Sequence, residues 1–183
     1  MGSYELARSR EWVVGNGLGG YASSTIIGLN NRGYHGLLVA CLNLRLARVL
    51  LLSKIEEEVA TVGETYQLST NQYPEAICPE GFRCQEEFRL DPFPSFLYRA
   101  GNLVVEKSLF MVHEENATVV TYQVLNAPGS ATIRLDPLVN CRDFHGRTHE
   151  GTLTFEQSPG EKTVCILERN RGIRLFLMSD VAA

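Results

Sequence analysis

The sequence predicts an all-β fold, a large antiparallel β-sandwich, and two observations along the chain lead to this prediction. Apolar and polar residues alternate with a period of two in four segments: 120–124, 132–136, 152–156 and 173–178. This period places one face of each strand in a core and the other in water or against a second layer. Turn sequences separate the strands at short spacing, which implies hairpins and therefore antiparallel pairing.

Taken in chain order, the first half also has the character of strands. The apolar run 12–14 and the β-branched stretch 21–28 precede a third apolar run at 37–42. Two stretches interrupt the pattern. The segment 69–81 contains two prolines and is predicted to be a long loop, and 91–94 is a second interruption.

In the second half, turn chemistry bounds the strands. The turns are Asn126-Ala-Pro-Gly129, His145-Gly146, Ser158-Pro-Gly160 and Asn170-Arg-Gly172. In the last strand, one face carries Ile173, Leu175 and Leu177. The opposite face carries Arg174, Phe176 and Met178.

The chain shows no flexible linker and no repeat of fixed period, so residues 1–183 are predicted to form a single β-sandwich domain. The last strand, 173–178, is followed by five residues. A sandwich strand normally finds a partner, and an unpaired edge is a liability. We therefore expect the chain to be a piece of a longer protein.

Composition excludes several classes of function. The net charge of −4 gives no electrostatic basis for nucleic-acid binding, and no apolar run is long enough to span a membrane. No signal peptide is visible at the N-terminus. The five cysteines include no C-x-x-C pair, which argues against disulfides and zinc and suits a reducing cytoplasm. The expectation is a cytoplasmic protein without a metal, a membrane or a nucleic acid as partner.

One motif suggests a nucleotide cofactor. Gly15, Gly17 and Gly20 fit the G-x-G-x-x-G pattern of dinucleotide-binding loops. In that fold the last glycine opens a helix, and an acidic residue follows about 20 positions later. Here a β-branched stretch follows Gly20, and no Asp or Glu occurs between Gly20 and Glu56. We therefore predict no nucleotide site and expect no cofactor.

Three polar clusters on predicted loops are the candidates for a functional site. They are Asn16 in the glycine loop; Arg32, Tyr34 and His35 in the segment 30–36; and Arg142, Asp143 and His145 in the segment 140–146. Amide and guanidinium groups bond neighbouring sugar hydroxyls, and aromatic rings cover the apolar face of a sugar. Singly, these residues also fit a tight turn, a core histidine or a surface ion pair. Gathered on loops between strands, they favour a site.

The chain also carries a series of motifs in a fixed order: Glu11-Trp12, 16–23, 32–40, 93–98, Glu106-Lys107, 116–122 and 137–145. This series resembles the N-terminal domain of bacterial and archaeal glycogen debranching enzymes of the amylo-α-1,6-glucosidase type, and it covers most of the chain. The sequence departs from the family pattern at Ser24, at Gly33 and in the stretch 93–96.

The resemblance implies a supersandwich of the kind found in the N-terminal domain of glucoamylase and in galactose mutarotase. It also implies that a C-terminal (α/α)6 barrel hydrolyses the α-1,6-glucosidic branch points of glycogen. The partners would then be that barrel, in the same polypeptide, and the α-glucan. The cluster of Arg142, Asp143 and His145 is predicted to meet that of Arg32, Tyr34 and His35 at one end of the sandwich, facing the barrel.

No catalytic residue is assigned within this chain. Glycoside hydrolysis needs two carboxyl groups that flank one bond. The acidic runs Glu56–Glu58 and Glu86–Glu87 lie on strand-like segments and are predicted to be solvated faces. The chain alone is therefore expected to be inactive, although its parent protein is expected to be a glycoside hydrolase.

Two other functions stay open. A stand-alone carbohydrate-binding module would present aromatic residues such as Tyr34, Phe93, Phe96 and Phe144 in a groove. A purely structural scaffold for the barrel would instead present a broad apolar patch.

Overall fold

The computed structural model describes residues 4–42 and 47–180, and its strands form four antiparallel sheets. A six-stranded sheet has the order β1-β2-β3-β4-β12, with β5 also paired to β4: β1 (Glu11–Gly15), β2 (Tyr21–Thr25), β3 (Gly36–Cys41), β4 (Arg48–Thr61), β5 (Glu64–Gln67) and β12 (Thr132–Asp143). A four-stranded sheet has the order β11-β10-β9-β8: β8 (Gln85–Leu90), β9 (Pro94–Ala100), β10 (Leu103–Met111) and β11 (Thr118–Asn126).

The two smaller sheets complete the molecule. One is the hairpin of β6 (Thr70–Gln72) and β7 (Ile77–Glu80). The other has the order β13-β14-β15: β13 (Phe155–Pro159), β14 (Thr163–Glu168) and β15 (Ile173–Met178). The described helices are short: α1 (Tyr4–Ser9) and the 3₁₀ turn η1 (Gly81–Arg83). No helix in these described ranges is long and apolar enough to cross a membrane.

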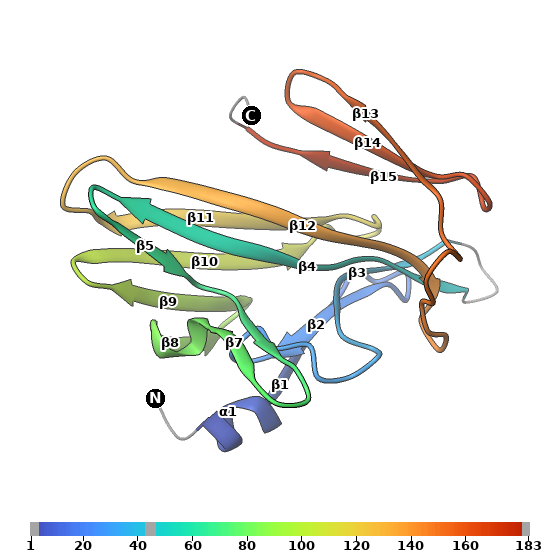
Figure 1. Ribbon diagram of the computed structural model, residues 1–183. Coiled ribbons are helices and arrows are strands. Elements are labelled where there is room, and N and C mark those ends of the chain that lie inside the picture. The colour runs from blue at the N-terminus through green and yellow to red at the C-terminus, as the bar shows by residue number, and fades with distance from the viewer. Residues whose placement is uncertain (1–3, 43–46, 181–183) are drawn as a thin grey trace.

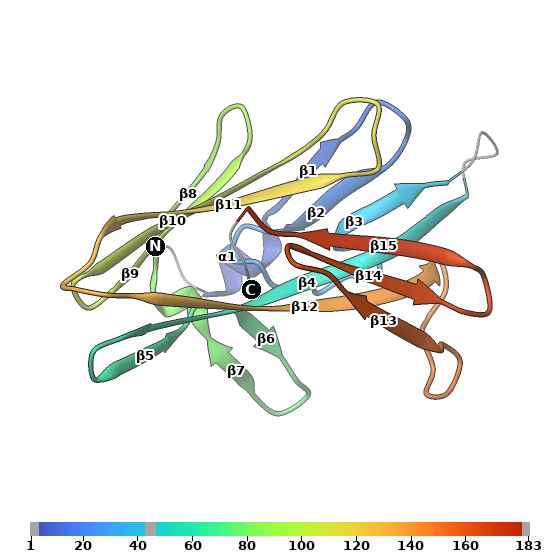
Figure 2. The ribbon, with the colours of Figure 1, turned by 90° about the horizontal axis from the view of Figure 1, so that it is seen from above.

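The sheets are stacked in layers (Figure 1). The six-stranded and four-stranded sheets face each other, and β13, β14 and β15 lie over the opposite side of β4 and β12, as the view from above also shows (Figure 2). The prediction of an all-β, antiparallel fold is confirmed. The supersandwich stays a prediction, because no sheet of the described residues closes or curls round.

Strand β4 is the centre of this arrangement. It is 14 residues long, and β12 pairs with one of its edges from Val49 to Ala60. Its other edge is shared between β3, over Arg48 to Leu52, and β5, over Glu58 to Thr61. Both edges of β4 are therefore hydrogen-bonded along most of their length.

The main core fills the space between the two large sheets. In β9 the side chains of Phe96 and Tyr98 are buried, while Arg99 is exposed, as a period of two requires. Trp12 packs edge-on against Phe96, and its indole Nε1 donates to the carbonyl oxygen of Thr25 at 3.0 Å. The core also extends to β15. Leu175 belongs to the same buried cluster as Leu51 and Cys141, which joins β15 to the six-stranded sheet.

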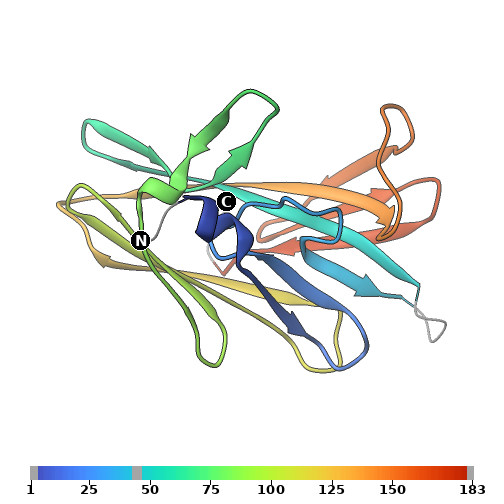
Figure 3. The ribbon, with the colours of Figure 1, turned by 90° about the horizontal axis from the view of Figure 1, so that it is seen from below.

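The helix α1 belongs to a small separate cluster. Its buried Ala7 packs with Ile27 and Leu29 from the segment after β2, so the helix covers that end of the core (Figure 3). This packing fixes the position of Ile27 and Leu29, which directly precede the segment 30–36.

Three expectations from the sequence need correction. Glu57 was predicted to be solvated, but it is 2% exposed, because Lys107 and Tyr122 from the opposite sheet bind its carboxylate. Phe96, which would be exposed in a groove if the chain were a carbohydrate-binding module, is a core residue at 2% exposure. The segment 69–81, predicted to be a loop, contains the β6–β7 hairpin.

Candidate functional site

Two loops that are more than 100 residues apart in the chain meet at one place. The phenol oxygen Oη of Tyr34 lies 3.1 Å from Nδ1 of His145. The rings of Tyr34 and Phe144 are 5.6 Å apart, and those of Phe144 and His145 are 3.9 Å apart. We call these three rings, with Arg48 and Arg142, the Tyr34 corner. The loops come together because one leads into β3 and the other leaves β12, and both strands flank β4.

Arg142 ties the two loops to each other. Its Nη1 donates to the carbonyl oxygens of Asp143, Phe144 and Gly146 at 3.2, 3.1 and 3.0 Å. Its Nη2 donates to the carbonyl oxygen of Gly33. The guanidinium is therefore used within the protein, and it forms no ion pair with Asp143 among the described residues. The Asp143 carboxylate instead accepts the backbone N–H of His145 at 2.9 Å.

Sequence reasoning missed Arg48, which belongs to the corner, and Tyr21, which contacts it. The guanidinium of Arg48 lies 5.4 Å from the centre of the Phe144 ring, and its Nε donates to the carbonyl oxygen of Gly19 at 2.6 Å. The Tyr21 hydroxyl donates to the carbonyl oxygen of Tyr34 at 2.9 Å. Neither residue belongs to a polar cluster in the sequence, since each stands at the start of a strand. Their contacts depend on pairing between strands.

Arg32 and His35 flank Tyr34 but interact with Glu11. The Nε of Arg32 is 2.5 Å from Oε1 of Glu11, and Nε2 of His35 is 3.6 Å from the same oxygen. The His35 side chain is buried, and its Nδ1 has no hydrogen-bond partner among the described residues. Burial lowers the pKa of His35, and the Glu11 carboxylate opposes this effect only partly. His35 therefore faces the protein interior, whereas Tyr34 is exposed.

Asn16 lies apart from the corner and is fully buried. Its Oδ1 accepts the N–H groups of Leu18 and Gly20 at 3.0 and 2.9 Å, and its Nδ2 donates to the carbonyl oxygen of Glu115 at 2.8 Å. The glycine loop thus joins β1 to β2 as a hairpin and leads into a strand, without the helix that a dinucleotide site requires. Asn16 shapes this loop and offers no exposed group.

The Tyr34 corner presents aromatic rings and polar atoms at the surface of the protein. Tyr34 is 48% exposed, and the exposed His145 and half-buried Phe144 stand beside it. Asp143 is the one carboxylate in the 142–146 turn, so no second carboxyl group flanks a common point there. The cavities found in the described residues have room for about one water molecule each, and neither adjoins the corner. No cluster of potential metal ligands occurs in the same residues.

Comparison with known families identifies the family of this chain. A family model described as "Glycogen debranching enzyme N terminal" matches residues 10–182, which include all seven candidate residues. The chain belongs to this family. No curated protein and no solved structure matches the chain. The glycogen debranching enzyme N-terminal domain is thus β-rich here, with the Tyr34 corner on its surface.

Proposed function

We propose that this chain is the accessory N-terminal domain of a glycogen debranching enzyme that hydrolyses the α-1,6-glucosidic branch points of an α-glucan. The family match over nearly the whole chain supports this role, because an N-terminal domain of such an enzyme implies a catalytic domain as partner. In this proposal residues 1–183 form one β-sandwich domain, and an (α/α)6 barrel later in the same cytoplasmic polypeptide carries the catalytic carboxylates.

The Tyr34 corner is proposed to border the substrate cleft and to contact the glucan. The observation that supports this most is the Tyr34–His145 contact, which places exposed rings and polar atoms from two loops side by side. Such rings pack against the apolar face of a sugar, while phenol and imidazole groups bond its hydroxyls. Arg142 holds both loops before any ligand arrives, which lowers the entropic cost of binding.

The seven candidate residues divide into two groups under this proposal. Tyr34 and His145 contact the glucan, with Asp143 at the edge of the same surface. The other four, Asn16, Arg32, His35 and Arg142, support the loops from within, because their polar groups are engaged by the protein or buried.

A scaffold function is the second candidate, and the outer face of β15 favours it. Phe176 is 58% exposed and Met178 is 78% exposed, so an apolar surface is available to a neighbouring domain. A stand-alone carbohydrate-binding module has less support, because Phe96 is buried and the exposed Phe93 pairs with Phe110 on another sheet rather than joining the corner.

The proposal is tested in the full-length enzyme with the variants His145→Ala and Tyr34→Phe. Each loses a hydrogen bond to substrate, so kcat/KM on a branched glucan should fall about tenfold while the thermal midpoint stays nearly constant. Arg142→Ala should lower both quantities, since it releases both loops. His149→Ala, an exposed residue a few positions further on, is the control. Unchanged kinetics with a lowered midpoint in the first two variants would reject the substrate role and leave the scaffold.

A further inference from the structure

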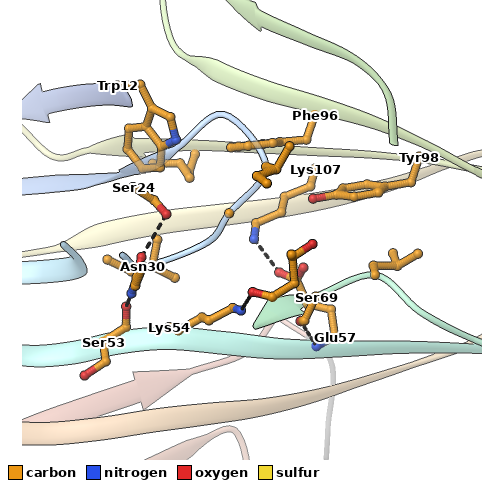
Figure 4. Close-up of a pocket in the computed structure, with 16 residues that line it drawn as sticks. Trp12, Ser24, Asn30, Ser53, Lys54, Glu57, Ser69, Phe96, Tyr98 and Lys107 are labelled. Carbon is orange, nitrogen blue, oxygen red and sulfur yellow. Dashed lines mark hydrogen bonds and ion pairs between the residues drawn. The ribbon is translucent and has the colours of Figure 1, made fainter. Parts of the chain in front are cut away.

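A small cavity lies between the two large sheets, beside the buried ammonium of Lys107 (Figure 4). It offers about 20 Å³ to the centre of a water-sized sphere. One water molecule needs roughly 10–15 Å³ by this measure, whereas a sugar needs far more. Trp12, Phe96, Tyr98 and Glu57 form part of its wall with Lys107.

The neighbouring Lys54 shows what a satisfied buried lysine looks like in this core. Its ammonium has three donors, and three oxygen acceptors surround it. The carbonyl oxygen of Thr70 and Oδ1 of Asn71 both lie at 2.6 Å, and Oε1 of Glu56 lies at 3.4 Å. No further acceptor is needed at Lys54.

Lys107 is equally buried but has fewer partners. Among the described residues its ammonium meets one oxygen acceptor, Oε1 of Glu57. The ring of Phe96, with its centre 5.6 Å from Nζ, adds a cation–π contact but no lone pair. Two N–H donors of a buried cation thus have no oxygen partner within the described protein.

Tyr98 also turns its polar end toward this cavity, as Figure 4 shows. The residue is 3% exposed, and its hydroxyl forms no hydrogen bond within the described ranges. Burial raises the pKa of Tyr98 well above its ordinary value, so the hydroxyl keeps its proton and can donate as well as accept. Buried hydroxyl and ammonium groups rarely lack partners, because desolvation without a hydrogen bond is costly.

We propose that the cavity is a binding site for one ordered water molecule, held by Nζ of Lys107 and Oη of Tyr98 and donating to the Glu57 carboxylate. Three hydrogen bonds are usual for a buried water. The water supplies one of the two missing acceptors of the Lys107 ammonium and leaves the third N–H to the Phe96 ring. The ion pair of Lys107 and Glu57 joins β10 to β4, one strand from each large sheet. The water is therefore part of the contact between the two sheets.

The direct test is a crystal structure of this chain at about 1.5 Å resolution. We expect an electron-density peak of one water within about 3.2 Å of both Lys107 Nζ and Tyr98 Oη. In Tyr98→Phe the peak should be lost, and the thermal midpoint should fall by about 2–4 °C. Tyr122→Phe is the matched control. It removes a hydroxyl that bonds Glu57 directly at 2.6 Å and does not line the cavity, so the peak should remain.

A solution measurement gives a second readout that does not depend on crystals. Magnetic relaxation dispersion counts long-lived internal waters, and we expect one fewer in Tyr98→Phe than in the original chain and in Tyr122→Phe. The proposal is overturned by a cavity without density in the original chain, by a direct Tyr98–Lys107 or Tyr98–Glu57 hydrogen bond that closes it, or by equal counts of internal waters in all three proteins.

Discussion

Two sequence neighbours, Tyr34 and His35, have opposite environments. Tyr34 is 48% exposed, whereas His35 is 5% exposed. They directly precede β3, where the backbone becomes extended and successive side chains point to opposite sides. The same short segment therefore supplies both an exposed ring for the corner and a buried group that anchors it.

The buried His35 makes stability depend on pH. Its pKa is lowered below the ordinary value of 6.5, chiefly by burial, so the unfolded chain takes up the proton before the folded one does. The stabilisation that neutral, buried His35 gives to the folded state is complete above pH 6.5. It is lost as the pH falls from 6.5 toward the lowered pKa of His35. Urea unfolding from pH 7.5 to 5 should show a shallower decline for His35→Asn than for the original chain. Parallel declines would contradict this prediction, and His149→Asn is the exposed control.

Single residues also show where sequence reasoning failed. Glu57 and Lys107 are 50 positions apart and lie on different sheets, so nothing in the run Glu56–Glu58 indicates that its middle carboxylate is paired. Arg142 was predicted as a candidate from its residue type, but its four carbonyl acceptors arise from loop conformation. Residue type predicted a polar cluster and could not predict which groups the protein itself uses.

At the scale of elements, the β1–β2 hairpin depends on two asparagines. Asn16 closes the glycine loop from within, and Asn116 both donates to the carbonyl oxygen and accepts from the N–H of Cys41, each at 2.9 Å. The side chain of Asn116 thus replaces one residue of a pairing strand at the end of β3. Gly17 and Gly19 have φ of +82° and +93°, which favours glycine there.

The Asn16 side chain should therefore matter more than its size suggests. Asn16→Ala leaves the N–H groups of Leu18 and Gly20 without their acceptor, and we expect a loss of about 1–3 kcal/mol in the free energy of unfolding. Asn31→Ala, in an exposed position, should change it by less than about 0.5 kcal/mol. Urea denaturation of the two variants checks the difference. Equal midpoints would show that the loop closes without Asn16.

The strands themselves were largely predictable. Alternation identified β11, β12 and β15 because less exposed and more exposed side chains alternate along at least part of each strand, a pattern that the residues of a single strand carry. The β6–β7 hairpin was missed because its strands are three and four residues long and one contains proline. The loop pairing of Tyr34 with His145 was also predicted, from residue type and not from geometry.

At the scale of the whole molecule, three layers share one cluster of buried residues. Alternation and turn spacing predict antiparallel strands, but they do not indicate that β13, β14 and β15 form a separate sheet over β4 and β12. That arrangement depends on packing between sheets, such as that of the cluster in which Leu175 and Cys141 are both buried. The relation of these layers to a catalytic domain stays a proposal.

Neighbouring residues of β15 test this layering. Leu175 is 8% exposed and faces the six-stranded sheet, so Leu175→Ala should lower the free energy of unfolding by about 2–5 kcal/mol. Phe176, 58% exposed, faces outward, and Phe176→Ala in this chain should cost less than about 0.5 kcal/mol. Chemical denaturation measures both. A larger effect at Phe176 would mean that the opposite face of the small sheet is the packed one.

The two edges of β4 gain their partner strands at different times during protein synthesis. Its first edge is completed almost at once, since β3 precedes it and β5 follows three residues after Thr61. The partner of its second edge, β12, is translated about 70 residues later, on the order of 4–14 s at the usual speed of a ribosome. For that interval the partner of this edge has not yet been synthesised, and an open strand edge can pair with another nascent chain.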